Sequence, residues 1–96
     1  MSAKLLCQAI AERKRVSFIH RDERYTVEPY SVGYEPRDGR DGQPLRLRAW
    51  SRDGWTDFQV KFMSRIEIGA PFSADRLGHR AMEIVLCDVY GKSWQT

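Results

Sequence analysis

Residues 45–62 read LRLRAWSRDGWTDFQVKF, and this stretch predicts a β-hairpin. Apolar and polar residues alternate on both sides of Asp53-Gly54, with the period of two that is typical of half-buried strands. Asp-Gly between such runs favours a type I′ turn, whose two central residues both need positive φ. A turn centred on Asp53-Gly54 would set Ala49 opposite Phe58 and would place the apolar residues of both strands on one face.

The opposite face of the same hairpin is expected to be basic and aromatic. The expected register sets Arg46 opposite Lys61, and directly opposed like charges destabilise a sheet unless an anion lies between them. Cations pair with phosphates, and indoles offer rings on which bases stack. We therefore predict an anion-binding or nucleic-acid-binding site made by Arg46, Arg48, Trp50, Trp55, Lys61 and Arg65. The alternative is a solvated outer face, with the two indoles packed under the C-terminal tail.

The chain before the hairpin predicts one helix followed by strands. Apolar residues at helical spacing favour an amphipathic helix over residues 3–14. The period then changes to two, which predicts strands at 15–20 and at 24–28, the second continuing after a bend at Pro29 towards residue 34. Pairing Phe18 with Val27 leaves residues 21–24 as the turn. The polar stretch 36–42 predicts a loop.

The chain after the hairpin is less regular. Residues 64–68 predict a final strand, closed by Gly69 and Pro71. In the C-terminal extension (69–96), apolar residues at helical spacing favour a short helix ending before Gly91. Several of these residues are β-branched, so a strand is the alternative. Residues 1–96 are therefore expected to form one domain, with strands over 15–68.

Composition limits the class of protein. Ninety-six residues allow one domain with one core, and 42% apolar with 30% charged residues is typical of a globular chain. The net charge of +3 favours anionic partners only mildly. No apolar run is long enough to span a membrane, and the N-terminus does not resemble a secretory signal. Cys7 and Cys87 belong to no Cys-x-x-Cys pair, so we expect buried, reduced thiols and a cytoplasmic protein.

Catalysis has little support in the sequence. Cys87 and His79 are a conceivable nucleophile and base, but their separation defines no geometry. The two histidines and two cysteines do not have metal-ligand spacing. We therefore predict no enzymatic activity, no metal and no cofactor.

The order of these pieces resembles the WYL domain, a family of small β-barrels found mainly in bacterial transcriptional regulators. The resemblance covers roughly residues 5–68. It is carried by Ala9-Ile10, Val16, Phe18, Arg24-Tyr25, Val27, Pro29, Leu47, Ala49-Trp50, Phe58, Val60 and Ile66. It implies a partly open Sm-like barrel of about five antiparallel strands with an N-terminal helix.

The resemblance also implies a regulatory module that senses a ligand or binds nucleic acid through a basic surface. This chain has Leu45-Arg46-Leu47 where the family has Trp-Tyr-Leu, and Gln59 and Phe62 where the family often has arginines. Arg46, Lys61 and Arg65 are expected to replace that charge. The alternative function is a protein-interaction or oligomerisation module, because small barrels leave open strand edges.

Overall fold

The central hairpin forms where the alternation predicts it, but with a different turn. The structure is a computed structural model that describes residues 2–34, 44–80, 82 and 84–92. Strand β3 spans Arg46–Ser51 and strand β4 spans Gly54–Gln59. Positive φ occurs at Gly54 (90°) and not at Asp53, so Arg52 and Asp53 make the turn and Gly54 follows it. This is the type I turn closed by a left-handed glycine, in place of the predicted type I′ turn.

The predicted hairpin register is therefore wrong by two residues. Trp50 pairs with Trp55, Arg48 with Asp57, and Ala49 with Thr56 rather than Phe58. The Ser51 hydroxyl helps to set this turn, because its oxygen accepts a hydrogen bond from the Asp53 amide at 3.1 Å. A shift of two preserves the period of the pleat, so the predicted faces of the hairpin stay the same.

The hairpin of β1 (Lys14–His20) and β2 (Glu23–Tyr34) contains the type I′ geometry. Arg21 and Asp22 have φ of 51° and 67° and form a two-residue turn. Phe18 consequently pairs with Tyr25, which corrects the predicted pairing with Val27. Strand β2 is continuous, and the register shift in its pairing with β3 lies at Pro29, where a bend was expected.

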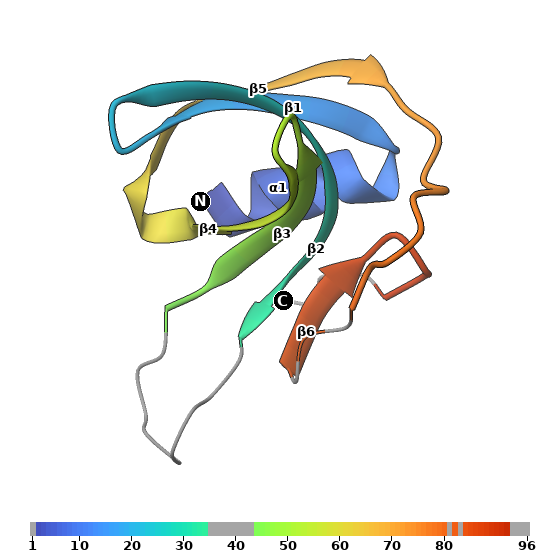
Figure 1. Cartoon of the computed structure of the whole chain (residues 1–96). Coiled ribbons are helices and arrows are strands. Elements are labelled where there is room, and N and C mark those ends of the chain that lie inside the picture. The colour runs from blue at the N-terminus through green and yellow to red at the C-terminus, as the bar shows by residue number, and fades with distance from the viewer. Residues whose placement is uncertain (1, 35–43, 81, 83, 93–96) are drawn as a thin grey trace.

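The described strands form one open antiparallel sheet in the order β4-β3-β2-β1-β5, with β6 paired to β2 (Figure 1). The 3-10 helix η1 (Val60–Phe62) connects β4 to β5 (Met63–Pro71). The sheet curls round an apolar core and does not close between β4 and β5. The predicted class, a mainly β, partly open small barrel with an N-terminal helix, is confirmed. The predicted loop at 36–42 lies outside the described residues.

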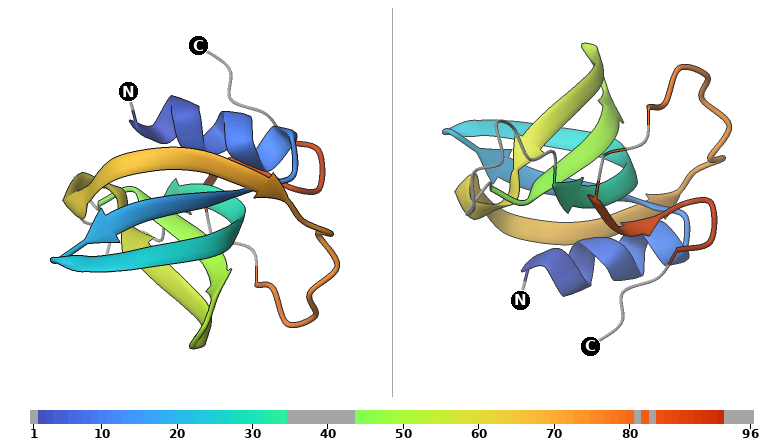
Figure 2. Two further views of the ribbon diagram at one scale, coloured as in Figure 1. Left: turned by 90° about the horizontal axis from the view of Figure 1, so that it is seen from above. Right: turned by 90° about the horizontal axis from the view of Figure 1, so that it is seen from below.

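Helix α1 (Ser2–Ala11) ends three residues earlier than predicted. The chain leaves the helix through Arg13, which has φ of 57°, a left-handed conformation common just beyond a helix C-terminus. Figure 2 shows α1 on the side of the barrel where β5 and β1 run, while the β3–β4 hairpin projects to the other side. The apolar stripe of α1 is fully buried, with Leu6, Ala9 and Ile10 each at most 1% exposed.

The C-terminal extension contains a strand, not the favoured helix. Strand β6 spans Ile84–Asp88 and pairs with residues 31–34 of β2. This pairing brings Cys87 beside α1, where it forms a disulfide with Cys7 across a Cα–Cα distance of 5.9 Å. The expectation of two reduced thiols is therefore wrong, although both residues are buried as expected.

Candidate functional site

The six residues predicted as a site fall into two groups in the structure. Arg48, Trp50 and Trp55 lie beneath residues 72–80, hereafter the covering segment. With Tyr30 of β2 they form what we call the covered face. The other three lie near η1: Lys61 is in it, Arg65 follows it in β5, and Arg46 pairs with Gln59, the residue before it. The predicted opposition of Arg46 and Lys61 is thus wrong, because β4 ends at Gln59.

Arg48 makes a bidentate ion pair rather than presenting free charge. Its Nε and Nη2 atoms donate to the two carboxylate oxygens of Asp57, each at 2.7 Å. Its Nη1 atom donates to the main-chain carbonyl of Arg80 at 2.6 Å. The Arg48 side chain is 13% exposed, so its charge is largely satisfied inside the molecule.

The two indoles pack against other rings. Trp50 and Trp55 meet edge to face with ring centroids 5.4 Å apart, and Trp55 meets Tyr30 in the same way at 4.7 Å. His79 of the covering segment lies 5.4 Å from Trp55 and is stacked on Tyr30 at 5.6 Å. The indoles are therefore packed under the C-terminal part of the chain, which is the alternative raised by the sequence.

An exposed aromatic ring in η1, that of Phe62, has two cations over it. The guanidinium carbon of Arg21 is 4.3 Å from the centroid of the Phe62 ring, and Nζ of Lys61 is 5.1 Å from it. Phe62 is 42% exposed. Among the described residues, Arg21, Lys61 and Arg65 take part in no ion pair. We call Arg21, Lys61, Phe62 and Arg65 the η1 corner.

Sequence reasoning missed two members of the η1 corner. The predicted alternation places Phe62 on the apolar face of the hairpin, but the 3-10 helix breaks the alternation and leaves the residue 42% exposed. Arg21 was predicted only as part of the turn at residues 21–24. Its left-handed conformation directs the side chain over Phe62, and the spacing of 41 residues left no sequence signal for that contact. Arg65 also has positive φ (52°), at a register shift between β1 and β5.

His20 lies behind the η1 corner among aromatic rings. Its ring is 5.3 Å from that of Phe58 and 6.3 Å from that of Phe62. Within the described residues its buried Nε2 atom has no hydrogen-bond partner. Burial, assisted by the charge of Arg21, lowers the pKa of His20 below its ordinary value of 6.5. The imidazole is therefore neutral at pH 7.

This histidine gives stability a dependence on pH. Below about pH 6.5 the unfolded chain binds a proton that folded His20 resists, so the free energy of unfolding falls as the pH drops. We expect His20→Phe to gain stability relative to the wild type as the pH is lowered from 7 to 5. Urea denaturation at several pH values measures this, and His79 contributes equally to both proteins. If the difference in the free energy of unfolding between the two proteins stays constant with pH, the lowered pKa of His20 is contradicted.

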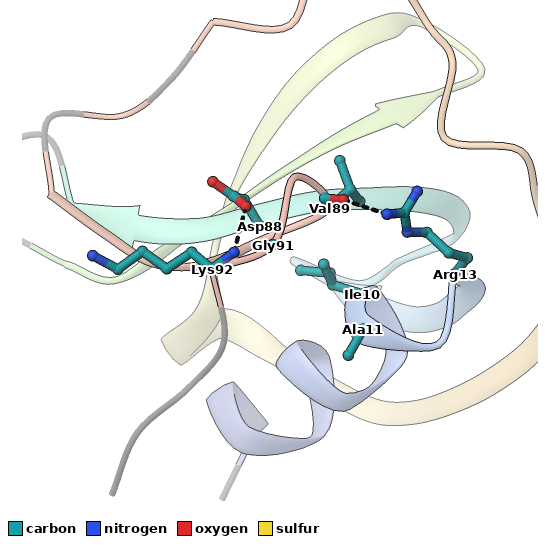
Figure 3. A pocket seen from close by; sticks show the side chains of 7 residues that line it. All are labelled: Ile10, Ala11, Arg13, Asp88, Val89, Gly91 and Lys92. Atoms are coloured by element: carbon teal, nitrogen blue, oxygen red, sulfur yellow. Dashed lines mark hydrogen bonds between the residues drawn. The ribbon is translucent and has the colours of Figure 1, made fainter.

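A small hollow lies at the C-terminal end of α1 (Figure 3). Its volume is about 160 Å³, below the roughly 300–1,000 Å³ of most ligand sites. Arg13 donates to the Val89 carbonyl there, and the Asp88 carboxylate accepts from the amides of Tyr90 and Lys92. These polar groups hold the chain after β6 against the helix. We therefore assign the hollow a structural role.

Two pairings suggestive of catalysis have structural explanations. Cys87, considered with His79 as a nucleophile and base, is in the disulfide. Oγ of Ser31 lies 3.1 Å from Nε2 of His79, but Ser31 is completely buried while the covering segment is in place, so a substrate does not reach this hydroxyl in this structure. The pair instead fastens the covering segment to β2.

Among the described residues, no group of three or more His, Cys, Asp or Glu side chains is arranged to hold a metal ion. None of the described helices is long and apolar enough to cross a membrane. Comparison of the chain with protein-family models, curated proteins and solved structures gave no match. The resemblance to the WYL domain therefore remains a prediction.

Proposed function

We propose that the chain is a binding module for a negatively charged partner, and that the η1 corner is the contact surface. The observation that carries this proposal is the exposed Phe62 ring with Arg21 and Lys61 over it. A guanidinium that rests on a ring keeps its N–H edge free for a phosphate. The uncovered part of the ring offers apolar surface to a base. Single-stranded nucleic acid combines both features.

Further cations close to η1 along the chain and in the sheet favour the same class of partner. Lys61 and Arg65 are exposed, and Arg46 enters the hairpin beside the start of η1. Three of the six residues predicted from the sequence thus contribute to the proposal, while the indoles do not. A role as a regulatory module, which the resemblance to the WYL domain implies, is part of this proposal. A small anionic ligand is the second partner of the same chemistry.

Anisotropy of a fluorescein-labelled single-stranded oligonucleotide, DNA or RNA, tests the proposal without relying on buried indoles. Arg21→Glu/Lys61→Glu should weaken binding at least about tenfold and should reduce the slope of log K against log salt by about 2. Arg80→Glu/Lys92→Glu is the matched control, because it changes the net charge equally with exposed side chains that do not belong to the η1 corner. Equal losses in both variants would reject the corner as the site.

Phe62→Ala separates stacking from charge. If a base rests on the ring, this change should cost about 1–3 kcal/mol of binding at unchanged salt slope. An unchanged affinity would leave phosphate as the recognised group and would favour a small anionic ligand. Absence of binding by the wild type at low salt would reject nucleic acid as the partner.

The open sheet edges support a second proposal, a protein-interaction or oligomerisation module. Strands β4 and β5 lie at the two ends of the strand order, so each has one unpaired edge within the described sheet. Such edges accept a further strand. Sedimentation velocity at low and high salt tests self-association, which should persist at high salt if strand pairing drives it.

The cytoplasmic location is likewise a proposal. It was inferred partly from reduced thiols, and the Cys7–Cys87 disulfide removes that support, since such bonds persist mainly in oxidising compartments. Thiol labelling of the protein taken directly from cells tests it, because a cytoplasmic pool should label at both cysteines.

A further inference from the structure

We propose that the covered face is a recognition surface for an extended peptide with the pattern Arg-x-Gly-His, and that residues 76–79 of the chain's own covering segment occupy it. This goes beyond the proposed function, since it concerns other residues and another partner. The contacts of the covering segment show what the surface recognises. Each is made by a side chain of the barrel to a group that any peptide with this pattern would carry.

The arginine position has the most contacts. Nε and Nη2 of Arg76 donate to the two carboxylate oxygens of Glu28 at 3.1 and 3.3 Å. The guanidinium carbon lies 4.8 Å from the centroid of a Trp50 ring, which is a cation–π contact. The Arg76 amide donates to the Tyr30 hydroxyl at 2.9 Å. The surface thus recognises both the side chain and the backbone of this residue.

The next two positions differ in what they allow. The carbonyl of Leu77 accepts from the indole nitrogen of Trp55 at 2.9 Å, but the Leu77 side chain is 90% exposed, so any residue fits there. Gly78 has φ of 90°, and a Cβ added to it would lie 3.1 Å from the same indole nitrogen. The third position therefore requires glycine.

The last contacts select histidine and fix the chain direction. The His79 ring is stacked on Tyr30, and its Nε2 atom lies 3.1 Å from Oγ of Ser31. One residue further, the Arg80 carbonyl accepts from Arg48. Three barrel side chains thus hydrogen-bond to the backbone of residues 76–80: the Tyr30 hydroxyl accepts, and the Trp55 indole and the Arg48 guanidinium donate.

The surface keeps its charges paired when the segment leaves. Nη2 of Arg15 lies 3.5 Å from the Glu28 carboxylate, so Glu28 has a second cation. Arg48 keeps its bidentate pair with Asp57, which belongs to the same hairpin. Trp50 and Trp55 pack on each other across that hairpin. The surface is therefore organised by the barrel, independently of the covering segment.

Within the covering segment, residues 76–80 are held by polar and ring contacts and not by buried apolar side chains. The segment has no regular secondary structure, and the side chains of Asp75, Arg76, Leu77 and Arg80 are exposed. The buried apolar residues that fix its ends, Phe72 and Met82, lie outside positions 76–80. A segment with few buried apolar contacts opens at low free energy without unfolding the domain. Another peptide with the same pattern can then take its place.

A peptide with the sequence of residues 74–82 tests the proposal. The protein variant Arg76→Ala/His79→Ala weakens the internal occupant and leaves the surface intact. This variant should bind the peptide saturably, with a shift of the Trp55 indole N–H signal in NMR spectra. Binding to the wild type should be at least about tenfold weaker, because its surface is already occupied at high effective concentration.

Peptides with single alanine substitutions distinguish sequence-specific recognition from non-specific binding. Replacing the peptide's arginine or its glycine with alanine should each weaken binding at least about tenfold, since each removes a contact described above. Replacing its leucine should have no effect. No saturable binding to the folded double variant, or equal binding of the alanine-for-glycine peptide, would overturn the proposal.

If the double variant does not fold, hydrogen exchange in the wild type tests whether the covering segment opens locally, as the proposal requires. The Arg76 amide and the Trp55 indole N–H should exchange at least about a hundredfold faster than the amides of Val27 and Val32 in the core, because local opening suffices. Exchange of all four only through global unfolding would overturn the proposal.

Discussion

Removing the Cys7–Cys87 disulfide should lower the free energy of unfolding by about 4.5 kcal/mol. The two cysteines are 80 residues apart, so the bond closes a loop that contains most of the chain. In the chain-entropy account, opening a loop of this length releases about 15 cal/mol/K in the unfolded state, which gives this figure at 25 °C. A domain of this size has a total stability of about 5–15 kcal/mol, so the loss would take much of it.

Thermal unfolding of the double variant Cys7→Ala/Cys87→Ala measures the effect. Its melting temperature should lie about 20 °C or more below that of the oxidised wild type. The wild type treated with a dithiol reductant is the control, because it keeps both sulfur atoms and loses only the bond. Equal melting temperatures with and without reductant would show that the bond contributes little.

The disulfide was beyond sequence reasoning because nothing local marks it. Cys7 is on the helix and Cys87 is in a stretch for which a second helix was favoured. They meet only because β6 joins the edge of β2 at residues 31–34. The β-branched residues Ile84, Val85 and Val89 supported the strand, but helical spacing in the same stretch supported the helix. Tertiary pairing with β2 decided between two local preferences of similar strength.

The hairpin shows how far pattern reasoning reaches. Alternation predicted correctly that Leu47, Ala49 and Phe58 face the core, since all three are buried. It did not determine the register, because a slip of two residues leaves the faces unchanged. The turn determines the register, and Gly54 is compatible with two turns. The hydroxyl of Ser51, bonded to the Asp53 amide, accompanies the turn that forms.

The sequence predicted which candidate residues share one side of the hairpin, but not which of them stay accessible to a partner. Strand parity places Arg46, Arg48 and Trp50 on one side of β3 and Trp55 on the same side of β4. It says nothing about which segment later covers that side. Arg48 forms an ion pair with Asp57 of its own hairpin. It also donates a hydrogen bond to the main-chain carbonyl of Arg80, which is 32 residues further along the chain. Of the six predicted residues, the two exposed cations are Lys61, in the 3-10 helix, and Arg65, in β5 after it.

Gly33→Ala should destabilise the fold by about 3 kcal/mol, near the upper end of the usual cost of overpacking. A Cβ at residue 33 would lie 2.1 Å from the carbonyl oxygen of Ile84 and 3.1 Å from Cα of Val85. Both atoms are backbone, so no change of rotamer relieves the clash. Strand β6 must move away from β2, and the ladder at the register shift beside Gly33 is lost.

Gly69→Ala is the matched control for this change. Its Cβ would lie 3.6 Å from the carbonyl of Arg15, an ordinary contact, and Gly69 does not have positive φ. Alanine there restricts the unfolded chain and should stabilise the protein by about 0.4–1 kcal/mol. Urea denaturation of both variants should therefore give shifts of opposite sign. Equal small shifts would mean that β6 is not seated against Gly33.

The Gly33→Ala variant also connects β6 to the disulfide. Cys87 pairs with Val32, directly beside the site of the clash, so displacing β6 moves its sulfur away from Cys7. Titration of free thiols during refolding should show slower disulfide formation in this variant than in Gly69→Ala, because two cysteines bond only when their Cα atoms come within about 7 Å. Equal rates would show that the disulfide forms before β6 pairs with β2. In that case the bond to Cys7 on α1, and not the hydrogen bonds to β2, would bring β6 into place.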